Sequence, residues 1–559
     1  MFLNFIGSNK KKIKLNLFDN ESLKQAHKRI FFTISFFILI YLSIFFKLTD
    51  VMIVSNLFDK NKEIAKIDDK IKILNRGNIY DRNGEILATT IRSFSLSLRP
   101  NLIKNKKNVT NKLVEIFSFK KEDIHKKIYS NSNFIWLKKN ISPKEHLKIN
   151  NLGEIGLQIH NEKRRIYPHG SITSHLVGFT NIDEKPMSGI ERGLNETLSN
   201  GEDVYLSVDL RLQYLVTEEL TKAINKFNAD GGVSIILDIS SGQILASSSL
   251  PNFDPNNITL TSQKNLFNSF SQGVYEMGST FKPITMAIGY DSNKISDLDE
   301  FEVNKPIKIG KYSINDHKPF DGSLNIREII VKSSNIGAAK VAKLIGTETQ
   351  KQYLKKFGLL EKQLLEIPET GSPLVPKPWR PVNTMTIGYG YGLSVSPLQL
   401  CSAYATLVNG GITVKSTYLR DNHTNYYQRV ISEKTSIKVR ELLRAVILET
   451  EWTGPKARVE GYEVGGKTGT AELIEDSQYH KKANLSSFIG VFPMSDPKYI
   501  ILSMVRNPKG IEESYFNTTG AWVSAPIVSK IIKGMVNIFN IPPVDTKKIY
   551  KAELKKQKN

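Results

Sequence analysis

The sequence is nearly devoid of cysteine. Cys401 is the single cysteine in 559 residues, so no disulfide can form within the chain and no cysteine-based metal site is credible. The nine histidines show no H-E-x-x-H motif and no other paired spacing typical of metal ligands. No repeat recurs at the periods typical of solenoid proteins. These absences argue against a zinc enzyme and against a repeat protein.

Long uncharged stretches are equally scarce. The chain has one, Ile30–Phe46, which as a helix rising ~1.5 Å per residue would span roughly 26 Å, near the lower limit for crossing a bilayer. A cleaved signal peptide is the alternative, but its apolar region usually has only ~7–15 residues and ends in a small-residue cleavage site, which is not evident here. We therefore predict an uncleaved, single-pass anchor over residues 30–50. The basic leader is expected in the cytoplasm, and the chain after about residue 50 outside the inner membrane.

A surplus of positive charge accompanies this anchor. The net charge is +22, from 77 Lys and Arg against 55 Asp and Glu. Such a surplus favours anionic partners, but solvated surface lysine is the simpler explanation. The sequence shows no RNA-binding or zinc-finger pattern, and an exported chain does not meet nucleic acid. We therefore predict no nucleic-acid partner.

The region after the anchor reads as several elements. Residues 60–75 are charged and lack Pro and Gly, so they predict a short helix or a linker. A turn-rich stretch, Arg76–Gly84, precedes alternating residues up to Leu98 that predict strands. Residues 101–150 are rich in Lys and Asn with partial helical periodicity, which predicts a solvated helical insertion.

The second half of the chain predicts an α+β domain. An amphipathic helix is expected over Leu210–Phe227, capped by Asp209. A hairpin over residues 233–247 follows, and a strand at Tyr499–Val505 precedes a closing helix at Ala525–Phe539. Helices that separate two sets of strands indicate an antiparallel sheet. The length allows two to four domains, and 40% hydrophobic with 24% charged residues is a globular balance.

The first chemical motif is Ser279-Thr-Phe-Lys282. A serine and a lysine at i and i+3 face the same side of a helix, where a neutral amine can take the serine proton. Pro283 is tolerated only in the first turn of a helix, so Ser279 is expected at a helix N-terminus, where backbone N–H groups stabilise negative charge. Alone the pattern is weak, because Ser8–Lys11 and Ser118–Lys121 match it equally well.

Two further motifs follow in order. Ser333-Ser-Asn335 offers a hydroxyl that can relay a proton and an amide that both donates and accepts hydrogen bonds. Lys467-Thr-Gly-Thr470 follows two glycines that permit close approach of a ligand to a strand, and its lysine and hydroxyls suit a carboxylate. Singly, each motif also fits an ordinary turn or hairpin. Together and in this order they match the S-x-x-K, S-x-N and K-T-G signature of penicilloyl-serine transferases.

With their surroundings, these motifs resemble those of class B penicillin-binding proteins, which are peptidoglycan D,D-transpeptidases. The resemblance extends over most of the exported chain. Further matching segments are Arg76–Gly84, Arg165–Gly170, Gly189–Glu191, Ser207–Gln213, Asp238–Asn256 and Gly390–Gln399, in which Ser396 replaces the usual threonine. The segment Gly273–Lys282 and the compact C-terminus look most like the division-specific (septal) branch, and the elongation-specific branch is the alternative.

The resemblance implies roles for the motif residues. The implied catalytic residues are Ser279, Lys282, Ser333, Asn335 and Lys467, and the implied substrate-binding residues are Thr468, Gly469 and Thr470. Ser279 would attack the penultimate D-Ala carbonyl of a stem peptide, Lys282 would accept its proton, and the N–H groups of Ser279 and Thr470 would bind the oxyanion. The amine of a neighbouring stem would then open the acyl-enzyme. The resemblance implies neither a metal nor an organic cofactor.

The resemblance also predicts the architecture, an α+β protein with a single transmembrane helix. The predicted ranges are a cytoplasmic tail (1–29), the anchor (30–50), an elongated, dimerisation-like pedestal domain (51–228), a transpeptidase domain (229–541) and a basic tail (542–559). The transpeptidase domain is expected to have a β-lactamase-like antiparallel sheet flanked by helices. The segment Thr450–Ala457 departs from the family pattern, so no role is assigned to it.

The implied partners follow from the reaction. They are peptidoglycan stem peptides as donor and acceptor, β-lactams as inhibitors, the inner membrane, and a cell-division glycosyltransferase with other division membrane proteins. The catalytic domain would be periplasmic. A D,D-carboxypeptidase, a β-lactamase or a β-lactam sensor on the same fold is the rival. The absence of an E-x-x-L-N-type deacylation element and the presence of a pedestal favour the transpeptidase.

Overall fold

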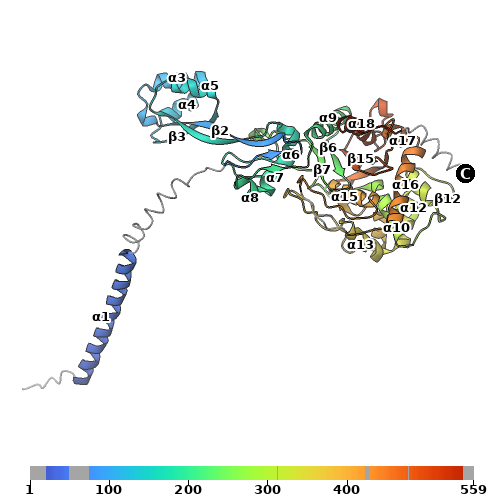
Figure 1. The fold of residues 1–559 in the computed structure, drawn as a ribbon, viewed down its shortest axis with the longest axis horizontal. Coiled ribbons are helices and arrows are strands. Elements are labelled where there is room, and N and C mark those ends of the chain that lie inside the picture. The colour runs from blue at the N-terminus through green and yellow to red at the C-terminus, as the bar shows by residue number, and fades with distance from the viewer. Residues whose placement is uncertain (1–19, 50–74, 311, 422–427, 476–477, 545–559) are drawn as a thin grey trace, which may run out of the picture. The chain divides into compact units, whose positions relative to one another are not determined.

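The computed structural model divides the chain into two units, Met1–Leu74 and Asn75–Asn559, which are described separately. The described residues are 20–49, 75–310, 312–421, 428–475 and 478–544 (Figure 1). Most of the predicted linker over residues 60–75 and most of the predicted basic tail over 542–559 lie outside these ranges.

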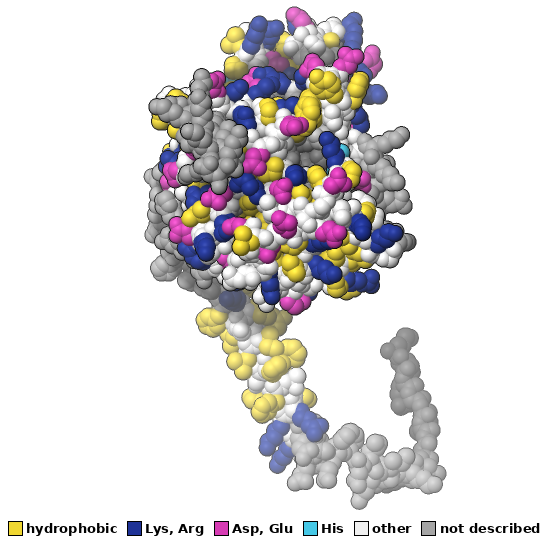
Figure 2. Space-filling model, turned by 90° about the vertical axis from the view of Figure 1, so that its right-hand side faces the viewer, with side chains coloured by type: hydrophobic (Ala, Val, Ile, Leu, Met, Phe, Trp, Pro, Cys, Tyr) yellow, Lys and Arg dark blue, Asp and Glu magenta, His cyan; other side chains and the backbone are white. Residues whose placement is uncertain are grey.

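The first unit contains one long helix, α1 (Asn20–Thr49). Within the described part of the chain, its segment His27–Thr49 is the one helix long and apolar enough to cross a membrane. The helix begins ten residues before the predicted anchor, because the polar leader from Asn20 to Arg29 continues the same helical turns. Figure 2 shows apolar side chains around the helix and basic ones gathered at one end.

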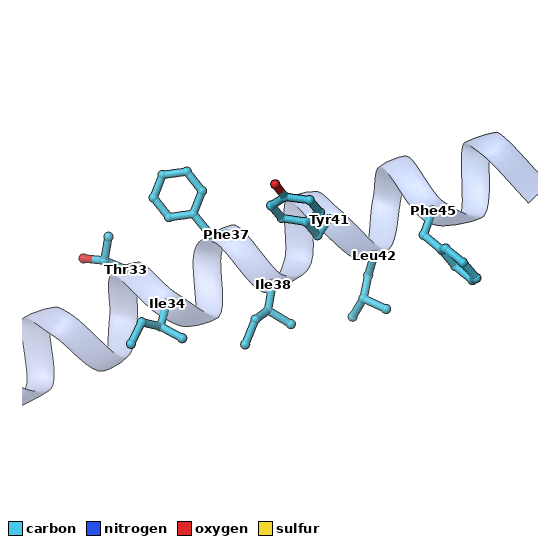
Figure 3. A pocket seen from close by; sticks show the side chains of 7 residues that line it. All are labelled: Thr33, Ile34, Phe37, Ile38, Tyr41, Leu42 and Phe45. Carbon is cyan, nitrogen blue, oxygen red and sulfur yellow. The ribbon is translucent and has the colours of Figure 1, made fainter.

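The apolar side chains of α1 project outward. Figure 3 shows Ile34, Ile38 and Leu42, four residues apart, on one side of the helix, with Phe37 and Tyr41 on another. They are exposed within the unit, as are most other large side chains of the helix. Water solvates such a surface poorly, so it is suited to a hydrocarbon environment.

The second unit begins with a five-stranded sheet built around β2 (Ile86–Leu98). This strand pairs antiparallel with β3 (Ile135–Ile141) and with β4 (Leu157–Ile166). The short β1 (Ile79–Tyr80) pairs with β2 and lies parallel to β5 (Val204–Tyr205). The strands expected after Arg76–Gly84 are thus confirmed, as one continuous strand.

Residues 101–150 contain the expected helices but are not simply solvated. α3 (Lys106–Phe117), α4 (Lys121–Ile128) and α5 (Pro143–Asn150) pack with β2 and β3 around a separate apolar core. The core side chains are Leu96, Leu98, Ile103, Val109, Leu113, Phe117, Ile124, Ile128, Leu137, Ile141 and Ile149. The expected solvated helical insertion thus has a core of its own, because the numerous Lys and Asn residues leave one face of each helix apolar, such as the i, i+4, i+8 series in α3.

A buried ion-pair network joins segments far apart in the sequence. Glu191, in α7 (Gly189–Gly193), is fully buried and accepts from Arg76 Nε at 2.5 Å and from Arg165 Nε at 2.7 Å. The Arg76 guanidinium also donates to the Glu191 carbonyl and to Asn195 Oδ1. Three segments singled out in the sequence therefore meet at one carboxylate.

Two more contacts tie this region to the C-terminal part of the unit. The Asp81 carboxylate, which also organises its own turn, accepts the backbone N–H of Leu210 at the start of α9 (Leu210–Lys226). Asn256 exchanges two hydrogen bonds with the backbone of Tyr167. These hydrogen bonds give partners to backbone groups of Leu210 and Tyr167 that would otherwise be left without them.

The C-terminal part is built on a five-stranded antiparallel sheet. In spatial order its strands are β14 (Gly465–Glu475), β15 (Gln478–Phe492), β16 (Tyr499–Arg506), β6 (Gly231–Asp238) and β7 (Ile244–Leu250). The predicted hairpin and the predicted strand at 499–505 are confirmed as β6–β7 and β16. Almost every residue of β6, β7 and β16 is buried, so both faces of the sheet are covered.

Helices cover the two faces. α9 and α18 (Ser524–Ile538) pack on each other and on one face, and α15 (Pro397–Val408) contacts β6 and β16 from the other (Figure 1). Both predicted helices are confirmed, and the Asp209 carboxylate caps α9 at Arg211 N. α9 precedes the predicted domain boundary at 228/229, yet it belongs to the core of this sheet.

The remaining helices of the C-terminal part lie between β7 and β14 in sequence. They are α10 (Lys282–Asp291), α11 (Ile326–Val331), α12 (Asn335–Ile345), α13 (Thr347–Lys356), α14 (Pro381–Ile387), α16 (Glu433–Glu449) and α17 (Thr453–Ala457). α10 packs against α12 and α16, and α16 packs against β14. This arrangement brings the start of α10, the start of α12 and β14 together.

Candidate active site

Ser279 lies in a tight turn at the start of α10. A 3₁₀ turn, Gly278–Phe281, leads directly into the helix, whose first residue is Lys282. Gly278 has φ +52° and donates its N–H to the carbonyl of Gly390 at 3.1 Å. A Cβ at Gly390 would lie 2.0 Å from the Gly278 carbonyl oxygen, so the two backbones can touch only because glycine stands there. The turn that presents Ser279 is thereby fixed.

The Lys282 amine is the centre of the site. Its Nζ lies 2.9 Å from Ser279 Oγ, 2.8 Å from Asn335 Oδ1, 3.1 Å from Ser333 Oγ and 2.6 Å from the Ser333 carbonyl oxygen. Lys282 is fully buried. An amine has three positions for hydrogen bonds, so four near oxygen atoms hold it in place whether it donates to Ser279 or accepts from it.

Ser333 and Asn335 come from the junction between α11 and α12. Ser333 adopts φ +60°, a left-handed conformation that is uncommon outside glycine, and in it presents both its carbonyl and its hydroxyl to Lys282. Ser334 caps α12 by accepting the N–H of Gly337 at 2.9 Å, which leaves Asn335 as the first helical residue.

A carboxylate that the sequence reasoning missed supports this junction. Asp316 accepts hydrogen bonds from Ser334 Oγ at 2.7 Å, from Ile336 N at 3.0 Å and from Asn335 N. Asn335 Nδ2 also donates to the carbonyl of Asn315 at 2.9 Å. The negative charge lies at the N-terminus of α12, where it is favoured by the helix dipole. In the sequence, Asp316 is only an acidic residue after a short strand, and such residues are too common to indicate a function.

Lys467 reaches the same centre from β14. Its Nζ lies 3.0 Å from Ser333 Oγ, 3.2 Å from the Thr468 carbonyl and 3.4 Å from Thr468 Oγ1, and the side chain is almost fully buried. The Ser333 hydroxyl therefore lies between two amines. Both amines can donate to Ser333 Oγ, so this hydroxyl can pass a proton to or from either of them.

The strand β14 has one open edge at the site. It is an end strand of the sheet and pairs only with β15, so its other edge faces the turn at Gly278–Phe281. A Cβ at Gly469 would lie 2.4 Å from Ser487 Oγ and 2.9 Å from the Met277 carbonyl, so glycine is needed for this close packing. Thr470 Oγ1 accepts the N–H of Gly520 at 3.3 Å. An extended peptide can add to such an edge through backbone hydrogen bonds.

Burial changes the basicity of both amines. The pKa of Lys282 is held well below its ordinary value, first because burial removes the ammonium from water and second because Lys467 repels a like charge, while Asp316 opposes both effects. Burial lowers the pKa of Lys467 to about 7. No described carboxylate forms an ion pair with either lysine. A neutral Lys282 can act as a proton acceptor.

The structure thus brings together residues from three distant stretches of chain. Ser279, Lys282, Ser333, Asn335 and Lys467 form one connected set, with Thr468 in contact with Lys467 and with Gly469 and Thr470 beside the Ser279 turn. Beyond Asp316, the sequence reasoning also missed Tyr404, which is fully buried and donates to the Thr280 carbonyl at 2.5 Å. The arrangement suits formation of a covalent intermediate on a serine.

Family profiles match both parts of the second unit. The profile described as "Penicillin binding protein transpeptidase domain" matches residues 232–533, which contain all three motifs. The profile described as "Penicillin-binding Protein dimerisation domain" matches residues 73–204, which contain the buried Glu191 network. The two matches together cover most of the second unit.

Several known sequences are similar over more than four fifths of the chain. The probable peptidoglycan D,D-transpeptidase FtsI of Caulobacter vibrioides is 32% identical over 475 residues, which cover 82% of this chain and 80% of that protein. The peptidoglycan D,D-transpeptidase FtsI of Escherichia coli is 28% identical over 508 residues, with 84% of each chain covered.

Solved structures share the fold. Penicillin binding protein 3 from Mycobacterium tuberculosis, complexed with aztreonam, aligns with a TM-score of 0.67 at 24% identity, covering 84% of this chain and 97% of that one. A peptidoglycan synthetase from Bifidobacterium adolescentis aligns with a TM-score of 0.66 at 20% identity, covering 84% and 96%. At these sequence identities, the structural similarity shows a shared fold, an α+β architecture with an N-terminal domain.

Proposed function

Because this chain belongs to the penicillin-binding transpeptidase family, we propose that it is a membrane-anchored peptidoglycan D,D-transpeptidase that works through an acyl-enzyme on Ser279. The enzyme crosslinks the peptide stems of the cell wall. The observation that carries the proposal is the Lys282 amine, which lies within hydrogen-bonding distance of Ser279, Ser333 and Asn335 at once. Both β-lactams and stems that end in D-Ala-D-Ala are ligands of this site.

The first half-reaction forms an ester. Ser279 Oγ bonds to the carbonyl carbon of the penultimate D-Ala as its proton passes to Lys282 Nζ. The N–H groups of Ser279 and Thr470 stabilise the oxyanion. The C–N bond to the terminal D-Ala then breaks, and the leaving amine takes a proton through the Ser333 hydroxyl, which contacts both lysine amines.

The second half-reaction transfers the acyl group to an amine. The acceptor amine attacks the ester carbon, its proton returns by the same route, and the bond to Ser279 Oγ breaks as the new peptide bond forms. In the first half-reaction, Lys467, Thr468 and Thr470 hold the carboxylate of the terminal D-Ala before it leaves, and the donor stem lies along the open edge of β14. β-Lactams imitate D-Ala-D-Ala and stop the cycle at the acyl-enzyme.

The test uses the full chain in detergent micelles. Fluorescent penicillin should label the wild type and fail to label Ser279→Ala, and incubation with a donor stem peptide and an acceptor amine should give a crosslinked product. Equal labelling of the two proteins would refute the nucleophile. Release of the free acid without any crosslink would show a carboxypeptidase instead.

The cellular setting extends the proposal. α1 is a single transmembrane anchor in the inner membrane, with its basic leader in the cytoplasm and the second unit in the periplasm. The site acts in septal wall synthesis beside a division glycosyltransferase, a role supported by the septal-type segment Gly273–Lys282 and by the FtsI name of the relatives. Depletion should give filamentous cells; round cells would indicate the elongation branch.

A further inference from the structure

An aromatic cluster with a lysine at its centre lies at the edge of the active site. The Lys456 amine, in α17, lies 3.7 Å from the ring centre of Trp522 and 5.5 Å from that of Trp452. The two indole rings are 5.7 Å apart, and Tyr515 packs edge-on against Trp522. We call Trp452, Lys456 and Trp522 the tryptophan–lysine cluster.

The cluster adjoins β14 through the loop before α18. In that loop Gly520 donates to Thr470 Oγ1 at 3.3 Å, and a Cβ on Gly520 would lie 2.8 Å from the Gly469 carbonyl. Trp522 follows two residues later and is fixed by a hydrogen bond from its backbone N–H to Thr519. α17 and α18, which hold Lys456 and follow Trp522 respectively, contact each other. Trp522 therefore lies two residues from a direct contact with β14.

The surface of the cluster is open to a ligand. Trp452 is 53% exposed, and Tyr515, which packs against Trp522, is 74% exposed, so part of this aromatic surface faces solvent. Exposed tryptophan and tyrosine are the residues that most often dominate binding surfaces. Trp452 and Lys456 both belong to Thr450–Ala457, the segment that differs from the family pattern.

The lysine of the cluster has no anion. No Asp or Glu among the described residues forms an ion pair with Lys456, whereas many other lysines of the chain have such a partner, for example Lys438 with Asp297. The two indole faces attract the ammonium but do not satisfy its N–H donors. Burial without a counter-ion lowers the pKa of Lys456. A bound carboxylate would stabilise the charged form of the Lys456 amine and accept hydrogen bonds from its N–H groups.

We propose that the tryptophan–lysine cluster is a subsite that binds a carboxylate of the peptidoglycan stem, beside the residues that react with it. This inference rests on the proposed transpeptidase function. The stem offers carboxylates from two sources, the side positions of the donor peptide and the amino acid that carries the acceptor amine. The inference covers either source, and the two arms of the experiment distinguish them.

The experiment compares carboxylate and amide forms of each source in full-chain protein in micelles. In the acceptor arm, acyl transfer to D-alanine is compared with transfer to D-alaninamide. In the donor arm, stems with a free carboxylate at the second position are compared with amidated stems. The wild type should favour the carboxylate in at least one arm. Lys456→Met should reduce that preference about fivefold to tenfold, as expected for a partly exposed charge-assisted bond.

Two variants control the result. Lys456→Arg keeps the charge and should retain the preference, while Lys498→Met removes an exposed lysine on another part of the sheet and should leave it unchanged. An unchanged carboxylate preference in Lys456→Met would overturn the inference, as would an equal loss with carboxylate and amide, which indicates damage to the fold. A wild type that transfers nothing at all would contradict the proposed function instead.

Discussion

Two clusters of buried charged groups in the second unit, one around Glu191 and one around Lys282, are built differently. At the Glu191 network, two arginines surround one carboxylate, with bonds of 2.5 and 2.7 Å and almost no exposure. At the active site, Lys282 and Lys467 share the Ser333 hydroxyl, and no described carboxylate pairs with either. The first place neutralises its charges by pairing them, and the second leaves its amines unpaired.

The residue types explain the difference. Arginine cannot lose its proton in a protein, so a buried guanidinium must have an anion. Lysine can respond to burial by becoming neutral, as the lowered pKa values of Lys282 and Lys467 indicate. A buried arginine pair therefore marks a structural joint, whereas buried unpaired lysines mark a place where proton transfer is possible. The predictions below test this separation of structure from chemistry.

The largest effect is expected from removal of the Lys282 amine. Lys282→Met keeps the length of the side chain and removes the proton acceptor, so acylation of Ser279 by penicillin should fall about a hundredfold to ten-thousandfold. The free energy of unfolding should change little or rise, because an unpaired buried amine is replaced by an apolar group. Stopped-flow labelling and urea unfolding followed by circular dichroism give the two quantities.

The matched control for that variant is Lys343→Met, which removes an exposed lysine from α12. It should acylate at the wild-type rate. If Lys282→Met kept its acylation rate, the assignment of the proton acceptor would be wrong. If it lost activity only because it failed to fold, its unfolding midpoint would drop as well.

The opposite pattern is expected at the Glu191 network. Glu191→Gln leaves two buried guanidinium groups around a neutral amide, which should cost about 3–5 kcal/mol of stability. The urea midpoint should fall sharply while the folded fraction still labels with penicillin. Glu196→Gln, an exposed change in the next helix, should leave the midpoint unaltered. A stable Glu191→Gln protein would remove the basis for calling this network a structural joint.

Much of the fold could be predicted from local pattern. The alternating and apolar runs at 233–247 and 499–505 predicted strands of the central sheet, and Asp209 predicted the start of α9. The order of the sheet could not be predicted, because β6 lies between β7 and a strand some 260 residues later. The core under residues 101–150 was missed because Lys and Asn dominate the composition there and hide the apolar face.

The third prediction concerns Lys467 and pH. Its pKa is about 7 when folded and ~10.4 when unfolded, so between these values the unfolded chain binds an extra proton. Stability should therefore rise with pH across this window, by roughly 1–3 kcal/mol, relative to Lys467→Met, in which the group is absent. Urea midpoints of both proteins at pH 7 and pH 9.5 measure the difference. Parallel curves would mean that the folded amine keeps its ordinary pKa.

The sequence identified the three motifs that the fold brings together, but it did not identify Asp316, which holds the second of them in place. The S-x-x-K, S-x-N and K-T-G motifs, in this order, indicate the candidate groups, because acyl transfer through a serine requires these residue types. Asp316 was missed because its partners lie 18–20 residues further along the chain, and only the folded junction between α11 and α12 brings them together. A lone acidic residue in a loop carries no local signal of such a role.

Asp316 gives the smallest expected effect and a specific test of the comparison, because its negative charge raises the Lys282 pKa against the effects of burial and of Lys467. Asp316→Asn keeps an oxygen for the amide N–H groups of Asn335 and Ile336 but removes the negative charge. Acylation should slow by about tenfold or less. Because the lost charge had raised the Lys282 pKa, the acid limb of the acylation rate should move to lower pH.

The matched control is Asp321→Asn, an exposed carboxylate in the same loop, which should shift nothing. A slower Asp316→Asn protein with an unmoved acid limb would mean that Asp316 acts only as a cap of α12. A limb that moved to higher pH would mean that Lys282 is not the titrating group. Only the downward shift fits a site whose amines are controlled by burial and by a single nearby anion, in contrast to the paired charges around Glu191.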